Sequence, residues 1–198
     1  MKLILTTILS LALSLGYSQC LDSAKVAKKK TFKSLEKAML EPDSVYVLDL
    51  SKQKLKEFPT DILLLKNLHV LILDKNKLKE IPESIGMLKC LIELRAKGNK
   101  LSGISNGILQ LGRLRILDLG DNEVETIPRG IGRLKQLEQL IIYSNIIGQF
   151  PMELQNLDSL KVLDLLNNDM SLDEQNLVFS LLPNSQIIFS PPCNCDFD

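Results

Sequence analysis

Leucine returns along this chain at a fixed interval. Six segments begin at residues 45, 68, 91, 114, 137 and 160, which are 23 residues apart, and each has leucine three positions after its start. These leucines are Leu48, Leu71, Leu94, Leu117, Leu140 and Leu163. A second column, mostly Leu or Ile, follows two positions later. Because residues two apart on a strand point to one face, each segment predicts a short strand whose leucines enter a core, the first over residues 46–50.

The residues after each predicted strand indicate a turn and then a path away from the sheet. Asparagine recurs eight positions after the start of five segments, and Gln53 replaces it in the first. An asparagine amide can bond to backbone groups of its own and neighbouring segments. An apolar residue and a proline, such as Ile81-Pro82, recur further on. Proline fixes φ and lacks a donor, so we expect it on the convex side.

The consensus LxxLxLxxNxLxxIPxxIxxLxx resembles the leucine-rich-repeat family, in the 23-residue subtype shared by Ras-suppressor-like and many bacterial members. The segment LHVLILDKNKLKEIPESIGMLKC, residues 68–90, carries the pattern most fully. The resemblance covers about two-thirds of the chain, residues 45–170. It implies an α/β fold, a right-handed β-α solenoid with a parallel concave sheet and helical caps at both ends. Each repeat buries its leucines only against its neighbours.

Residues 1–18 have the features of a secretory signal peptide. Lys2 precedes an apolar stretch too short to span a bilayer, and Gly16 and Ser18 form a small-x-small cleavage site. The residues before Cys20 depart from the lipobox of bacterial lipoproteins, so a lipid anchor at Cys20 is the less favoured alternative. We therefore expect an exported protein that is secreted, periplasmic or held at the cell surface, without an integral membrane span.

The regions that flank the repeats are predicted to cap the core. Residues 19–44 combine a lysine-rich, partly mobile tether with a short amphipathic helix between Phe32 and Leu40. Residues 171–190 combine a helix, opened by a capping box at Ser171 and Glu174, with a last strand over residues 186–189. Residues 191–198 form an irregular tail. In the third repeat, Ala96 replaces a larger core residue, so we expect looser packing there.

Little in the chain points to catalysis or to a cofactor. His69 is the only histidine, and the pattern places no nucleophile beside it. No phosphate-binding glycine loop or zinc-protease motif is present. The lysines and arginines balance the acids, which argues against a nucleic-acid partner. We expect no enzyme activity, no cofactor and no metal site, although Cys193-Asn-Cys195 is a weak metal-ligand signal.

The cysteines at 20, 90, 193 and 195 suggest a disulfide in an exported protein, but the sequence assigns no pairing. Cys90 and the C-terminal pair are separated by several stacked strands, which is too far for a bond. A bond between Cys193 and Cys195 would close a very tight ring. We interpret Cys90 as a small, shielded hydrophobic residue.

Two surfaces are candidates for binding. The concave face, made of the outward residues of the strands, mixes apolar anchors with charges, as protein-binding surfaces do. Its candidate partner-binding residues are Ile72, Asp74, Arg95, Lys97, Ile116, Asp118, Ile141 and Tyr143. The turns that follow the first two strands carry a basic edge, and later turns carry acids instead. The basic edge consists of Lys52, Lys54, Lys75 and Lys77.

These features favour an exported, non-enzymatic module that binds a protein through its concave face. One alternative is a structural or adhesive protein of the cell envelope that holds an anionic polysaccharide on the basic edge. A second alternative is an intracellular scaffold for small GTPases, which the repeat subtype suggests and which requires the signal-peptide interpretation to be wrong.

Overall fold

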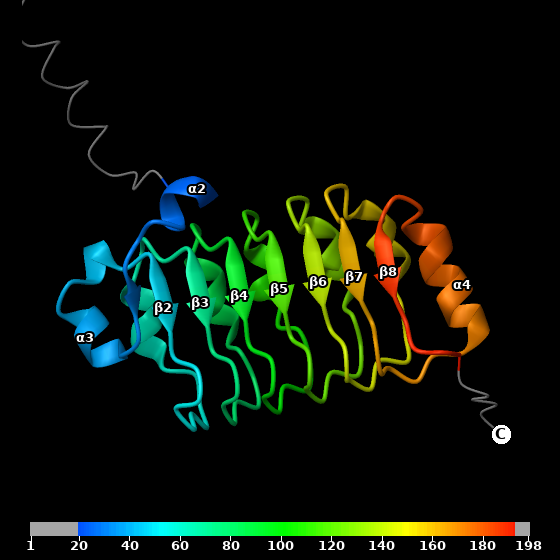
Figure 1. Cartoon of the computed structure of the whole chain (residues 1–198), viewed down its shortest axis with the longest axis horizontal. Helices are drawn as coiled ribbons and strands as arrows, with labels where there is room; N and C mark the ends of the chain where they lie inside the picture. The colour runs from blue at the N-terminus through cyan, green and yellow to red at the C-terminus, as the bar shows by residue number, and fades with distance from the viewer. Residues whose placement is uncertain (1–19, 193–198) are drawn as a thin grey trace, which may run out of the picture.

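The computed structural model describes residues 20–192, which form an elongated solenoid along one parallel sheet (Figure 1). Eight strands lie side by side in chain order. They are β1 Thr31–Phe32, β2 Val47–Asp49, β3 Val70–Ile72, β4 Glu93–Arg95, β5 Ile116–Asp118, β6 Gln139–Ile141, β7 Val162–Asp164 and β8 Gln186–Ile188. The α/β leucine-rich-repeat solenoid expected from the sequence is thus confirmed. The expected signal peptide, Cys193 and Cys195 lie outside the described residues.

The register of the sheet follows the 23-residue period without a slip. Leu48 pairs with Leu71, which pairs with Leu94, and the same column continues to Leu163. All six column leucines are fully buried. Because every repeat places the same residue at the same depth, the leucines form one continuous core along the solenoid.

The turns are held by the predicted asparagines. The side-chain amide of Asn76 donates to the carbonyls of Leu50 (2.9 Å) and Leu73 (2.8 Å), and its oxygen accepts from the backbone N–H of Leu55 (3.1 Å). Asn99, Asn122, Asn145 and Asn168 repeat this arrangement. Each amide bonds to its own and the preceding repeat, which confirms the predicted role of this column.

The convex side consists of short 3₁₀ helices. They are η2 Thr60–Leu64, η3 Glu83–Met87, η4 Ile108–Gln110, η5 Arg129–Arg133 and η6 Met152–Asn156. Four of them follow a proline, as the sequence predicted. The exception, η4, follows Gly107, where a Cβ atom would lie 2.1 Å from the Glu83 carbonyl oxygen. The glycine lets the backbone of the third repeat approach that of the second closely.

Both ends of the core are covered. At the C-terminal end, α4 Leu172–Leu181 begins with the predicted capping box: Ser171 N–H donates to Glu174 Oε2 (2.7 Å), and Glu174 N–H donates to Ser171 Oγ (3.3 Å). The N-terminal end has α2 Ser23–Val26, strand β1, α3 Leu35–Met39 and η1 Pro42–Ser44.

The N-terminal region differs from the expected basic tether. Strand β1 extends the sheet, pairing Thr31 with Val47 and Phe32 with Leu48. Phe32 and Ala38 are buried in the core cluster. Within residues 20–192, no helix is both long enough and apolar enough to cross a membrane.

Candidate partner-binding face

The concave face presents two rows of outward side chains. The central strands each bury their middle residue and leave the flanking residues half-buried, with Asp118 the exception. The sheet register aligns one row directly: Ile72, Arg95, Asp118 and Ile141 are neighbours on successive strands. Two residues further on, the second row contains Asp74, Lys97, Gly120 and Tyr143. Ile116, on β5, lies outside both rows at the start of its strand.

Three charged side chains of this face form an ion pair or a hydrogen bond with other residues of the sheet. Arg95 forms an ion pair with Glu93 on the same strand. Asp74 accepts a hydrogen bond from the backbone N–H of Lys97 (3.1 Å), and Asp118 accepts one from Gly120 N–H (3.1 Å). Burial raises the pKa of both carboxyl groups above their usual range, and the two hydrogen bonds oppose that rise.

Two members of the face are less open than the sequence suggested. The side chain of Asp118 was expected on the open surface but is only 3% exposed. Gly120, two residues after Asp118 and in the second row, has no side chain, and the ring of Tyr143 fills that space, since a Cβ at Gly120 would lie 2.4 Å from Tyr143 Cε1. Burial also raises the pKa of Tyr143. The alternation of the strand predicts the direction of a side chain, but not how its neighbours cover it.

The basic edge is fully open to solvent. Lys52, Lys54, Lys75 and Lys77 are exposed, and none of them forms an ion pair within the described chain. The charge asymmetry extends over the whole solenoid. Residues 20–100 contain 17 lysines and arginines against 11 acids, whereas residues 101–192 contain 6 against 11.

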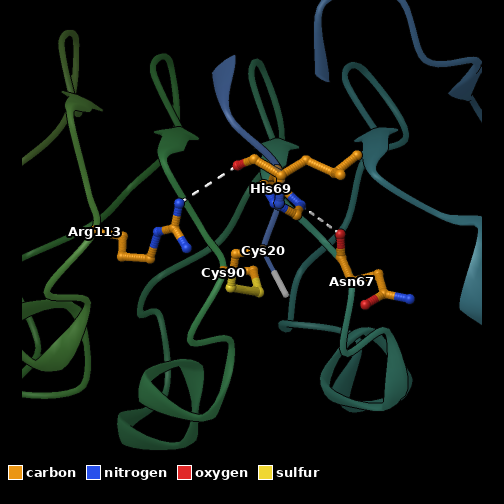
Figure 2. The surroundings of a disulfide bond; sticks show 6 residues. Cys20, Asn67, His69, Cys90 and Arg113 are labelled. Carbon is orange, nitrogen blue, oxygen red and sulfur yellow. Dashed lines mark hydrogen bonds between the residues drawn. A yellow bond between two sulfur atoms is a disulfide. The ribbon is translucent and has the colours of Figure 1, made fainter. Parts of the chain in front are cut away.

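A disulfide that the sequence did not assign joins Cys20 to Cys90, with their Cα atoms 5.2 Å apart (Figure 2). The interpretation of Cys90 as an unpaired, shielded hydrophobic residue is therefore wrong. The spacing of stacked strands bears only on a bond between Cys90 and the C-terminal cysteines, and the sequence around Cys20 pointed only to a lipid acceptor. The useful signal was the expectation of export, together with one cysteine near the predicted cleavage site and another between two repeats.

The disulfide holds an N-terminal segment, residues 20–26, against the residues that precede strands β3 to β5. The Leu21 N–H donates to His69 Nε2 (2.8 Å), and Arg113 donates to the Leu21 carbonyl (3.4 Å). Arg115 donates to Ser23 Oγ (2.5 Å), and Val26 is buried. Arg115 also pairs with Glu138, so side chains of the second, third, fourth and fifth repeats take part in holding this segment.

His69 has a structural role here. Its Nε2 accepts from an N–H group, so the proton of the neutral ring is on Nδ1, which donates to the Asn67 carbonyl oxygen (2.6 Å). Burial lowers the pKa of His69, and the positive charge of Arg113 lowers it further. The hydrogen bond to Asn67 opposes this lowering. Among residues 20–192, His69, Cys20 and Cys90 are the group whose ligand atoms lie close enough to hold a metal ion.

No protein-family model and no curated protein matches this chain. A leucine-rich-repeat protein of Leptospira interrogans is 34% identical over 76% of this chain and 45% of its own, with a TM-score of 0.61. The plant peptide hormone receptor RGFR1, solved in complex with RGF2, is 31% identical over 74% of this chain and 24% of its own, with a TM-score of 0.58.

An internalin of Listeria monocytogenes is 20% identical over 81% of this chain and 54% of its own, with a TM-score of 0.56. The chain spans about half the length of these structures or less. The comparisons agree with the unbroken leucine column, the asparagine turns and the parallel sheet in chain order. The chain is therefore a leucine-rich-repeat solenoid.

Proposed function

We propose that this chain is an exported, non-enzymatic recognition module that binds a protein partner through its concave face. The observation that carries this proposal is the pair of rows on β3 to β6, where Ile72 and Ile141 flank Arg95 and Asp118, and Tyr143 lies beside Lys97 and Gly120. Apolar and aromatic anchors among charged groups are the composition of protein-binding surfaces. We expect no catalysis there, because catalysis needs titratable groups that converge in a pocket, and an open sheet offers few.

Two further observations support the proposal. The receptor RGFR1, which has the same kind of solenoid, was solved in complex with RGF2. The disulfide between Cys20 and Cys90 suits an oxidising compartment and favours export over an intracellular scaffold for GTPases. The same bond occupies the Cys20 sulfur, the atom to which a lipid anchor would attach, so we expect the mature chain to carry no lipid.

The concave face is tested with the double variant Arg95→Glu and Tyr143→Ala. The variant reverses the central charge and removes the aromatic anchor, and losses of about 2 kcal/mol or more are typical at such positions. We expect capture of envelope and secreted proteins by the immobilised chain to fall at least about thirtyfold, because 1.4 kcal/mol is a factor of ten. Circular dichroism should show an unchanged fold.

The matched control is Arg133→Glu with Met87→Ala. These residues are exposed on the convex helices η5 and η3, so the control makes the same kinds of change away from the concave face. Capture that the control preserves and the concave variant loses supports the proposal. Equal capture by both folded variants contradicts it.

A second candidate function is binding of an anionic polysaccharide on the basic edge. The observation that favours it is that Lys52, Lys54, Lys75 and Lys77 are exposed and outside the ion pairs of the described chain. The first lysines also lie beside the lysine-rich N-terminal cap, because Gln53 Nε2 donates to the Lys33 carbonyl (3.0 Å). A protein with this surface would serve as a structural or adhesive component of the cell envelope.

A further inference from the structure

We propose that Cys20, His69 and Cys90 form a binding site for a zinc-class metal ion when the disulfide is reduced. The two sulfur atoms and a ring nitrogen of His69 lie within 4.8 Å of one another, and they come from three separate segments of the chain (Figure 2). Two thiolates and one imidazole, with a fourth position open to water, are a known tetrahedral ligand set for zinc. The metal and the disulfide are then alternative ways of holding the N-terminal segment.

The histidine is already oriented for this role. Its Nδ1–H donates to the Asn67 carbonyl (2.6 Å), which fixes the ring and leaves the lone pair on Nε2. Metal-binding histidines in proteins usually have such a partner behind the ring. The Nε2 lone pair now accepts from Leu21 N–H (2.8 Å). Leu21 follows Cys20 directly, so the shift that separates the sulfurs on a metal ion can also free this lone pair.

The surroundings favour a neutral metal complex. Cys90 is 4% exposed, His69 is 1% exposed, and Cys20 is half-buried. Two thiolates without a partner would be costly in such a buried place. A divalent cation balances the two negative charges, and thiolate sulfur is a ligand that favours zinc over magnesium or calcium.

Other contacts keep Cys20 near the site once the disulfide is open. Arg113 donates to the Leu21 carbonyl, Arg115 donates to Ser23 Oγ, and Val26 is buried. These contacts do not depend on the sulfur atoms. They hold the Cys20 thiol close to Cys90 and His69, which raises its effective concentration at the site.

The chemistry balances with a dithiol as reductant. The disulfide takes up two electrons and two protons and becomes two thiols, while the dithiol is oxidised to its own cyclic disulfide. The metal ion then binds both sulfurs and the Nε2 lone pair and displaces the two thiol protons. In the reverse step a disulfide oxidant takes up the two electrons and two protons and becomes a dithiol, while the Cys20–Cys90 bond re-forms and the metal ion is released.

The test uses the full chain with Cys193→Ser and Cys195→Ser, so that Cys20 and Cys90 are its only thiols. The chain is reduced with dithiothreitol, freed of reductant without air, and titrated with Co²⁺, whose thiolate complexes absorb strongly. We expect one cobalt per chain, sulfur-to-metal charge-transfer bands, d–d bands of a tetrahedral site, and displacement by Zn²⁺. The oxidised form of the same chain is the matched control and should bind none.

Two further variants identify the ligands. Cys20→Ser, in the same background, removes one sulfur at the end of the segment and leaves the repeats intact, and His69→Gln retains a side-chain acceptor for Leu21. We expect each to weaken cobalt binding at least a hundredfold, with an unchanged circular dichroism spectrum. No charge-transfer band from the reduced chain, equal binding by the oxidised chain, or full binding by the folded Cys20→Ser variant would each overturn the proposal.

Discussion

At the scale of single residues, one position of the repeat has a left-handed backbone conformation that its residue types do not predict. Residues in the turn after each strand have φ between 49° and 67°. They are Lys52, Lys75, Gly98, Asp121, Ser144 and Asn167. Only one is glycine, the residue that adopts this conformation most easily. The next repeat imposes the turn, since Lys75 N–H donates to the Lys97 carbonyl (2.8 Å) and its equivalents do the same, except that Asn167 N–H donates to Ser190 Oγ (2.8 Å) in the C-terminal cap.

Gly98→Ala should therefore lower the free energy of unfolding by about 1 kcal/mol. The cause is backbone strain at φ +67°, because the added Cβ would meet its nearest atom at 3.4 Å, without a severe clash. Gly103→Ala is the matched control: it lies in the same repeat, with no atom within 4 Å of its Cβ position and no positive φ. Urea unfolding measures both, and an equal change in the two variants would argue against strain.

Asp118→Asn should stabilise the protein at neutral pH and lose that advantage in acid. Burial raises the folded-state pKa of Asp118, so ionisation costs the folded state more than the unfolded chain. The gain of the variant should be absent below the ordinary pKa of 3.8, grow as pH rises through the raised folded pKa, and then level off. Asparagine still accepts from Gly120 N–H, whereas Asp118→Ala does not and should be less stable. A gain that is constant with pH would exclude the ionisation cost as its cause.

At the scale of elements, period and length decided what the sequence could predict. The six strands β2 to β7 follow one repeated pattern, and α4 begins with a capping box. Both features could therefore be predicted from the sequence. The two-residue β1 and the four-residue α2 are too short to carry a period of their own. They exist because Phe32 pairs beside Leu48 and because the disulfide, His69, Arg113 and Arg115 hold the segment. Such contacts join residues 16 to 92 positions apart, which local patterns do not encode.

The disulfide should contribute about 2–4 kcal/mol to stability, because it closes a long loop in the unfolded chain. The two cysteines are 70 positions apart in the sequence. We expect Cys20→Ser with Cys90→Ser to lower the urea midpoint without changing the circular dichroism spectrum. In a background with Cys193→Ser and Cys195→Ser, a dithiol reductant in metal-free buffer should destabilise the parent by a similar amount. It should leave the Cys20→Ser, Cys90→Ser variant unaffected; an equal response of both would mean that the reductant acts elsewhere.

At the scale of the whole molecule, the solenoid separates charge that the composition hides. The chain has 24 basic and 24 acidic side chains, yet the excess of positive charge lies in residues 20–100 and the excess of negative charge in residues 101–192. The sequence predicted this separation because the repeat order is also the spatial order. The sequence could not predict which side chains of the concave face are exposed, since the burial of Asp118 depends on contacts between strands. The repeat period determines where each residue lies in the solenoid, and side-chain packing determines which of these residues are exposed to solvent.

The basic edge predicts binding that depends on charge and salt. The chain should bind dextran sulfate and not neutral dextran, and affinity should fall about tenfold or more between 0.05 and 0.3 M salt, as exposed charges become screened. Replacing Lys52, Lys54, Lys75 and Lys77 with Gln should abolish this binding. The control replaces four exposed cations on and beside the convex helices, Lys66, Lys89, Arg129 and Arg133, with Gln, which changes net charge equally. If both quadruple variants lose binding alike, the net charge of the chain and not the basic edge is responsible. An affinity that does not change with salt would contradict an electrostatic site.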